Sequence, residues 1–185
     1  MEDDIQYVRL VLAGDKQAYT HIINAYKNEL YATILRMTRN PQTAQDLLQE
    51  AFIKVYEQLG KYEQKGSFKS WLYRVAINHC LDQFRKKTIQ FIQIEENQLV
   101  SETSPEVVFL KKEKSRELER LVARLPEEER LILLLRYANE LSYEEISETL
   151  RISLADVRNK LHRAKKKLRR HAQEGGYFHE LSERG

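Results

Sequence analysis

The sequence predicts an all-α protein: two small helical domains joined by an extended linker, the second domain being a helix-turn-helix. Only three prolines and six glycines interrupt 185 residues, and helix-forming residues dominate the remainder. Two complete helix starts also lie eleven residues apart between residues 141 and 170. That spacing is typical of a helix-turn-helix.

The first domain is expected over residues 1–88, with breaks at Gly14-Asp15, at Asn40-Pro41 and in a polar loop at 61–66. Asn is a good helix cap, and Pro suits the first helical position. Gly60 is the expected C-terminal stop of the helix that Asn40 opens. The helices are therefore expected before residue 14, at 16–38, at 41–59, and from Ser67 or Ser70 to about 87.

The second domain is expected after a linker, because residues 88–104 break the helical period. Their segment IQFIQI has strand-like composition but no visible partner strand, so an extended linker is the preferred interpretation. Ser104-Pro105 opens a helix to about 124. Leu125-Pro126 opens another, and the three glutamates that follow favour its positive N-terminal end. The expected divisions are a domain at 1–88, a linker at 89–104, a domain at 105–172 and a flexible tail at 173–185.

Capping residues at two successive helix starts predict the helix-turn-helix. Ser142 and Glu145 form a capping box, and Ser153 and Asp156 repeat it with the shorter acid. Hydrophobic staples flank both boxes: Leu141 with Ile146, and Ile152 with Val157. The first helix is therefore short, about 143–150, and a three-residue turn leads into a longer one.

The second helix of this motif has two distinct faces. Its apolar stripe comprises Leu154, Val157, Leu161, Ala164 and Leu168. The opposite face carries Ala155, Asn159, His162, Arg163, Lys166 and Arg170. Nine basic residues and one acid, Asp156, lie between Arg151 and Arg170. Such a helix suits phosphate binding and base reading in the major groove. A merely solvated basic helix is less favoured, because the caps and the face separation agree.

The helix at 41–59 also has two faces. Its core face comprises Ala44, Leu47, Leu48, Ala51, Phe52, Val55 and Leu59. The opposite stripe comprises Asp46, Gln49, Glu50, Ile53 and Glu57. An apolar residue with a charged rim is typical of a protein contact, although a solvated face with one stray Ile is equally compatible with this helix alone.

Aromatic and basic residues are interleaved in the segment that follows. The aromatic residues are Tyr62, Phe68, Trp71 and Tyr73, and the basic residues are Lys61, Lys65, Lys69 and Arg74. Aromatic faces stack on unpaired bases while cations follow the backbone. Trp71 recurs at helical spacing with other apolar residues and is expected in the core. Tyr62, in the loop, is expected to be more available for stacking, and Asn78 lies where it could read a base edge.

Composition excludes several classes of protein. The net charge is only +3, so the basicity is local, and the single cysteine, Cys80, excludes an internal disulfide and fits a reducing cytoplasm. No apolar run approaches the ~20 residues of a membrane span, and the acidic start MEDDIQYVRL differs from a signal peptide. We therefore expect a cytoplasmic protein that does not insert into membranes.

No enzymatic site is evident. None of the five histidines has a zinc-ligand spacing. His79 and Cys80 are adjacent, so on a helix they point to different faces and cannot form a dyad. We expect no catalytic residue, no metal site and no cofactor.

Three segments together resemble the extracytoplasmic-function (ECF) sigma factors of the sigma-70 family. TAQDLLQEAFIKVYEQL is similar to region 2.2, and GSFKSWLYRVAINHCLDQFRKK is similar to regions 2.3–2.4. LPEEERLILLLRYANELSYEEISETLRISLADVRNKLHRAKKKL is similar to region 4. The resemblance covers about residues 15–172. It implies a transcription initiation factor that binds core RNA polymerase, recognises the −35 and −10 promoter elements and assists promoter melting. The alternative is a helix-turn-helix regulator that acts without being a polymerase subunit.

The resemblance also implies roles for individual residues. Contacts to the polymerase would come from Asp46, Gln49, Glu50, Ile53 and Glu57. Contacts to the −10 element would come from Lys61, Tyr62, Phe68, Lys69, Asn78, Arg85, Lys86 and Lys87. Contacts to the −35 element would come from Arg158, Asn159, His162, Arg163, Lys166 and Arg169. A pocket that holds extruded bases of the −10 element would drive strand opening.

The implied partners are core RNA polymerase, through its β′ and β subunits, and promoter DNA, double-stranded at −35 and single-stranded at −10. An anti-sigma factor, in this family often membrane-anchored, is implied as an inhibitor. The chain departs from the family pattern in its helix-turn-helix. Arg151 stands where Gly is common, Ser147 where Ala is usual, and Asp156 where a small residue is common. The geometry of the turn is therefore the doubtful point of the motif.

Overall fold

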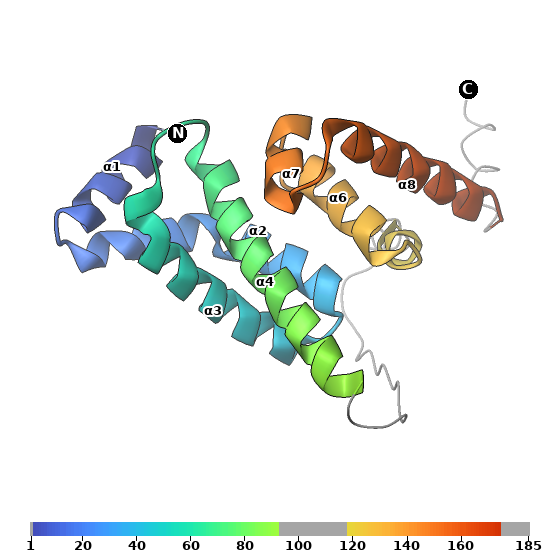
Figure 1. The fold of residues 1–185 in the computed structure, drawn as a ribbon, viewed down its shortest axis with the longest axis horizontal. Coiled ribbons are helices and arrows are strands. Elements are labelled where there is room, and N and C mark those ends of the chain that lie inside the picture. Colours follow the sequence, from blue (N-terminus) through green and yellow to red (C-terminus); the bar gives the residue numbers. More distant parts are fainter. Residues whose placement is uncertain (1, 93–117, 175–185) are drawn as a thin grey trace, which may run out of the picture.

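The structure is a computed structural model that describes residues 2–92 and 118–174 (Figure 1). These residues contain helices and no strand, in agreement with the all-α prediction. In the N-terminal half, residues 2–92, the α-helices are α1 (Glu2–Leu12), α2 (Tyr19–Thr38), α3 (Pro41–Gln58) and α4 (Phe68–Ile92). In the C-terminal half, residues 118–174, they are α6 (Glu127–Tyr137), α7 (Tyr143–Leu150) and α8 (Leu154–Glu174). Residues 118–123 are also helical, and 3-10 turns lie at Lys16–Ala18 and Leu59–Lys61.

The predicted start of α3 is confirmed. The Asn40 side chain accepts a hydrogen bond from the Thr43 N–H at 2.9 Å, and Pro41 is the first helical residue. The predicted stop at Gly60 is wrong. Gly60 lies inside a 3-10 turn, whereas the glycines with a positive φ are Gly14 and Gly66. The chain leaves α3 by tightening the last turn, so a left-handed glycine is not required there.

The predicted extended linker is wrong at its start, because α4 continues through residues 88–92. No Gly or Pro occurs between Gly66 and Pro105 that would end the helix earlier, and strand propensity alone is a weak predictor. The remainder of the predicted linker, 93–104, and the start of the helix predicted from 105 lie outside the described residues. At the C-terminus α8 runs two residues into the predicted tail, to Glu174, and residues 175–185 lie outside the described part.

The core of the N-terminal half lies between α2, α3 and α4. Among its fully buried side chains are Ile22 and Leu30 from α2, Val55 from α3, and Leu72 and Ile77 from α4. Each such side chain contributes about 1.5–3 kcal/mol on burial, so this face-to-face packing is the main stabilising term. None of the described helices combines the length and apolar character needed to cross a membrane.

The two halves are packed against each other. Helix α4 contacts α7, and α2 contacts α6 (Figure 1). A single cluster of buried apolar residues extends from Val8 in α1 to Leu161 in α8. In this structure the two predicted domains therefore share one core.

Cys80 is expected to resist thiol reagents in the folded protein. The side chain is fully buried on α4, and this burial raises the pKa of its thiol to about 12. Near neutral pH the reactive thiolate is therefore scarce. Ellman's reagent should label Cys80 slowly in buffer and quickly after unfolding. Equal labelling rates in the two conditions would contradict the burial.

Candidate functional site

The first helix of the helix-turn-helix forms as predicted. The Ser142 hydroxyl accepts a hydrogen bond from the Glu145 N–H at 3.1 Å, and the Glu145 carboxylate accepts one from the Ser142 N–H at 2.8 Å. Leu141 and Ile146, the predicted staple, are both buried. The resulting helix, α7, spans residues 143–150, the range that its capping residues predicted.

The turn after α7 is left-handed at a residue that is not glycine. Arg151 has φ 55° and ψ 44°, a conformation that costs a non-glycine residue about 1–2 kcal/mol. Ser147 stabilises this turn. Its carbonyl accepts hydrogen bonds from the N–H groups of Arg151 and Ile152, and its hydroxyl donates to the Ile152 carbonyl at 2.6 Å. The two departures from the family pattern at 147 and 151 therefore meet in one turn and offset each other.

The second capping pair differs from the first. The Ser153 hydroxyl accepts from the Asp156 N–H at 3.1 Å and donates to the Asp156 carboxylate at 2.7 Å. Asp is one methylene shorter than Glu, and here its carboxylate bonds to the hydroxyl. This pair still caps the start of α8.

The predicted apolar stripe of α8 is confirmed except at its first residue. Val157, Leu161 and Ala164 are buried, and Leu168 is half-buried. Leu154 lies on the stripe but keeps 36% of its surface exposed. It lies in the first turn of the helix, where the chain arrives from a loop and fewer neighbours cover the side chain.

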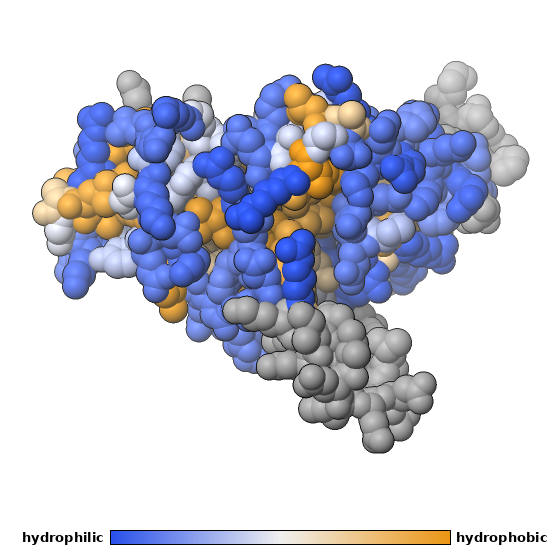
Figure 2. Space-filling model, in the orientation of Figure 1, coloured by the Kyte–Doolittle hydropathy of each residue, from blue (hydrophilic) through white to orange (hydrophobic). Residues whose placement is uncertain are grey.

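The six residues predicted to contact the −35 element are all exposed on α8 (Arg158, Asn159, His162, Arg163, Lys166 and Arg169). Hydrophilic residues dominate the surface over α8 in Figure 2. A basic hollow along α8 is lined by His162, Arg163, Lys165, Lys166, Lys167, Arg169, Arg170 and Gln173.

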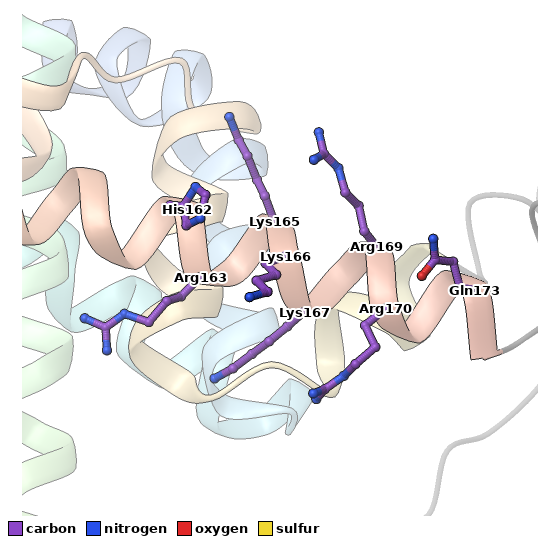
Figure 3. A pocket seen from close by; sticks show the side chains of 8 residues that line it. All are labelled: His162, Arg163, Lys165, Lys166, Lys167, Arg169, Arg170 and Gln173. Carbon is purple, nitrogen blue, oxygen red and sulfur yellow. The ribbon is translucent and has the colours of Figure 1, made fainter.

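The side chains of this hollow diverge, as Figure 3 shows. Lys165 and Arg169 project to one side of α8, and Arg163 and Lys167 project to the other. A small anion needs converging donors, whereas a DNA groove offers phosphates on both walls of an inserted helix. The arrangement therefore suits an extended polyanion better than a small anion.

Three basic residues of α8 also interact with α6. Lys160 pairs with Glu128, Lys167 pairs with Glu129 at 2.9 Å, and the Lys165 ammonium lies 5.2 Å from the centre of the Tyr137 ring. Part of the basic charge of α8 thus stabilises the packing of α8 against α6. The sequence shows that these lysines are basic. Only the packing against α6 distinguishes them from the basic residues of α8 that remain available for a partner.

The acidic stripe of α3 is exposed as predicted. Asp46, Gln49, Glu50, Ile53 and Glu57 all lie on the surface, and Ile53 keeps 60% of its surface exposed. The carboxylates have local partners: Asp46 accepts from Gln42, Glu50 lies 3.0 Å from His79, and Glu57 lies 2.8 Å from Lys54. The hydrogen bond and charge of Lys54 lower the pKa of Glu57, which keeps that end of the stripe ionised.

The aromatic residues of the loop and of α4 form a core cluster. Tyr62 is only 8% exposed, and its ring centre lies 5.2 Å from Phe68 and 5.4 Å from Trp71. The prediction that Tyr62 is available for stacking is therefore wrong for this conformation, as is a direct base contact by Phe68, which is 3% exposed. The Tyr62 hydroxyl donates to the Gly66 carbonyl, so the loop folds back over its own ring. The expected packing of Trp71 is confirmed.

The polar residues predicted to contact the −10 element differ in their solvent exposure and in whether they already have a partner. Lys61 and Arg85 are exposed. Lys69 is half-buried and pairs with Glu29 at 3.0 Å, and the half-buried Asn78 donates to the Arg74 carbonyl at 2.8 Å. The side chains of Lys86 and Lys87 lie outside the described part of the structure.

No metal centre is built into the described part of the chain. Across residues 2–92 and 118–174, no group of three or more His, Cys, Asp or Glu side chains is placed to hold a metal ion.

Comparison with protein families gives two matches. Residues 22–89 match Sigma-70 region 2, and residues 115–168 match Sigma-70, region 4. The chain is 32% identical over 174 residues to the ECF RNA polymerase sigma factor SigW of Bacillus subtilis, covering 88% of this chain and 93% of that one. It is 33% identical over 175 residues to the RNA polymerase sigma-H factor of Pseudomonas aeruginosa, covering 89% and 91%.

Two solved structures share the fold. CnrH in complex with the cytosolic domain of CnrY has a TM-score of 0.66 at 15% identity, covering 93% of this chain and 98% of that one. The sigma factor RpoE in complex with the anti-sigma factor NepR from Bartonella quintana has a TM-score of 0.67 at 18% identity, covering 82% and 94%. At these identities the likeness concerns the fold alone.

Proposed function

This chain belongs to the ECF RNA polymerase sigma factors of the sigma-70 family. We propose that three of its surfaces bind, respectively, core RNA polymerase, the −10 element and the −35 element. It is a promoter-recognising transcription initiation factor. The alternative of a helix-turn-helix regulator is not favoured, because region 2 is present together with region 4. Sigma factors are not catalytic, and the sequence likewise led us to expect no catalytic residue in this chain.

The exposed face of α8 would read the −35 element as duplex DNA. A helix of 21 residues is about 31 Å long, and the major groove, about 12 Å wide, admits it. Base contacts would come from Arg158, Asn159, His162 and Arg163. Phosphate contacts would come from Lys166 and Arg169. The support for this surface is its exposure and its position after a fully formed α7 and turn.

The start of α4 and the loop before it would bind the single-stranded −10 element. The polar contacts would come from Lys61, Lys69, Asn78, Arg85, Lys86 and Lys87. Tyr62 and Phe68 would shape the loop from within, because both rings are committed to the aromatic cluster.

The acidic stripe of α3 would bind core RNA polymerase. Ile53 offers an exposed apolar centre, and Asp46, Gln49, Glu50 and Glu57 surround it with polar and charged groups. Such a composition, with an apolar residue inside a polar rim, is what a protein interface requires.

An anti-sigma factor is the further partner that we propose. Both solved structures described above contain a sigma-like fold bound to a second protein, in one case named as an anti-sigma factor. Here the two halves enclose a groove, and Figure 2 shows apolar residues where they meet. Its apolar lining comprises Met37, Leu81, Phe84, Leu131, Ile132, Leu150 and Ile152. An amphipathic helix of an inhibitor would fit such a surface. We place the protein in the cytoplasm, together with the polymerase.

In vitro transcription with bacterial core enzyme tests the proposed function. Specific initiation should require this chain, and specific DNA binding should be stronger with polymerase than without it. DNA binding that polymerase does not change, together with no initiation, would favour the regulator instead.

A further inference from the structure

The three acids of the α3 stripe differ in where their partners lie. Asp46 and Glu57 each accept a hydrogen bond from a side chain of α3 itself. Glu50 instead meets His79 of the neighbouring helix α4: its Oε2 atom lies 3.0 Å from the Nε2 atom of the ring. The two residues are 29 positions apart in the sequence. A surface carboxylate of α3 is thus held from a second helix.

His79 is a firmly placed donor for this contact. Only 17% of its side chain is exposed, because α4 packs against α3 and the next residue, Cys80, is fully buried in the core. A carboxylate only accepts hydrogen bonds, which assigns the donated proton to Nε2 of the ring. The neutral form of the ring can supply that proton, so the contact does not require a charged histidine.

Glu50 borders the apolar centre of the stripe. It precedes Ile53 by three residues, a spacing at which side chains are neighbours on a helix surface. Ile53 keeps 60% of its surface exposed, and 49% of the Glu50 side chain is exposed although it bonds to His79. A partner that covers Ile53 can therefore also reach the carboxylate, which lies where the polar rim of an interface is expected.

A carboxylate that is already fixed binds a partner at a lower entropic cost. A glutamate on an exposed helix face samples several rotamers, and association has to restrict it to one of them. His79 restricts Glu50 before a partner arrives. Lys54, which bonds to Glu57, is itself a flexible side chain with 43% of its surface exposed, so it cannot fix its partner to the same degree. Glu50 is thus the acid of the stripe that is best prepared for binding.

We propose that His79 is a positioning residue of the polymerase interface, which holds the Glu50 carboxylate in the orientation that core RNA polymerase binds. This role rests on the proposed function, since it takes the α3 stripe to be the polymerase contact. The complementary group on the polymerase would be a cation or an N–H donor, because an ionised carboxylate only accepts hydrogen bonds. His79 acts through Glu50 and need not touch the polymerase itself.

The affinity of the full chain for core RNA polymerase, measured with a fluorescent label at the amino terminus, tests this role. His79→Ala should weaken binding roughly three- to tenfold, which corresponds to the net contribution of one intramolecular hydrogen bond. His79→Gln should retain most of the affinity, because its amide nitrogen can donate to Glu50 in place of Nε2. His21→Ala is the matched control. It removes a ring of α2 that stacks on Tyr7 at 4.4 Å, and it should bind as the wild type does.

A double-mutant cycle separates positioning from general support of the fold. In the Glu50→Ala background, His79→Ala should cause no further loss of affinity, because the group that it positions is already absent. If His79 mattered only for the packing of α4 against α3, its replacement would cost the same in both backgrounds. Urea unfolding at the same temperature checks that every variant is fully folded in the binding assay, so that lower stability cannot account for weaker binding.

The outcomes that contradict this role are distinct from one another. If Glu50→Ala binds polymerase as the wild type does, the stripe is not the polymerase contact, and the role of His79 fails with it. If Glu50→Ala weakens binding but His79→Ala does not, the interface stands and only the role of His79 is overturned. Equal losses from His79→Ala in the two backgrounds, or equal losses from His79→Ala and His79→Gln, would also overturn it.

Discussion

Replacing Asp46 by Arg is expected to abolish association with core RNA polymerase and to leave the fold intact. Asp46 lies on the exposed stripe of α3, two helical turns before Ile53, and it accepts a weak 3.2 Å hydrogen bond from Gln42. Such an exposed pair contributes a few tenths of a kcal/mol, so the free energy of unfolding should change by less than about 0.5 kcal/mol. At an interface, by contrast, a like-charge contact costs several kcal/mol.

Co-purification with core enzyme measures this effect, and urea unfolding confirms the fold. Asp82→Arg is the matched control, because it makes the same reversal at an exposed acid of α4, outside the stripe. It should retain binding. Ile53→Ala should weaken binding without a charge change, as expected for the apolar centre of an interface. Unchanged co-purification of Asp46→Arg would remove α3 from the polymerase interface.

Replacing Arg163 by Ala is expected to weaken recognition of the −35 element by roughly 1–3 kcal/mol, the range for loss of a base contact. Arg163 is exposed on α8, and in Figure 3 it projects to the side of the helix opposite Lys165 and Arg169. A bidentate guanidinium contact with a guanine would account for an effect of that size. The loss should therefore fall on one base pair of the element.

A set of single-base promoter variants measures that selectivity. Arg163→Ala should respond less than the wild type to substitution of the contacted pair. Lys166→Ala is the comparison: as a phosphate contact, it should weaken binding to all sequences alike and reduce the salt slope by about one. If the promoter-variant profile of Arg163→Ala matches that of the wild type, Arg163 does not read a base.

Features of the functional surfaces that depend on local sequence could be predicted, whereas those that depend on tertiary contacts could not. The exposure of Ile53 on α3 and of the basic face of α8 could be predicted, because helical period and caps place them. The burial of Tyr62 could not, because the ring is covered by Phe68 and Trp71 through a fold of the loop that no local pattern specifies. The exposure of Leu154 could not be predicted for a related reason: periodicity assigns a side chain to a helix face, but it does not say how far a neighbouring helix covers that face.

The sequence by itself determined the helical class, the start of α3 at Asn40, the bounds of α7 and the family. These features depend on interactions between residues that are close in the sequence, or on contiguous motif segments, and both can be recognised from the sequence alone. Only the tertiary structure decided how the turn at Arg151 is held and how the two halves meet. The Asn139 amide finds Tyr73 66 positions away, and the hydroxyl of Thr33 106 positions away. Contacts at such separations depend on the packing of complete helices, and no spacing in the sequence encodes them.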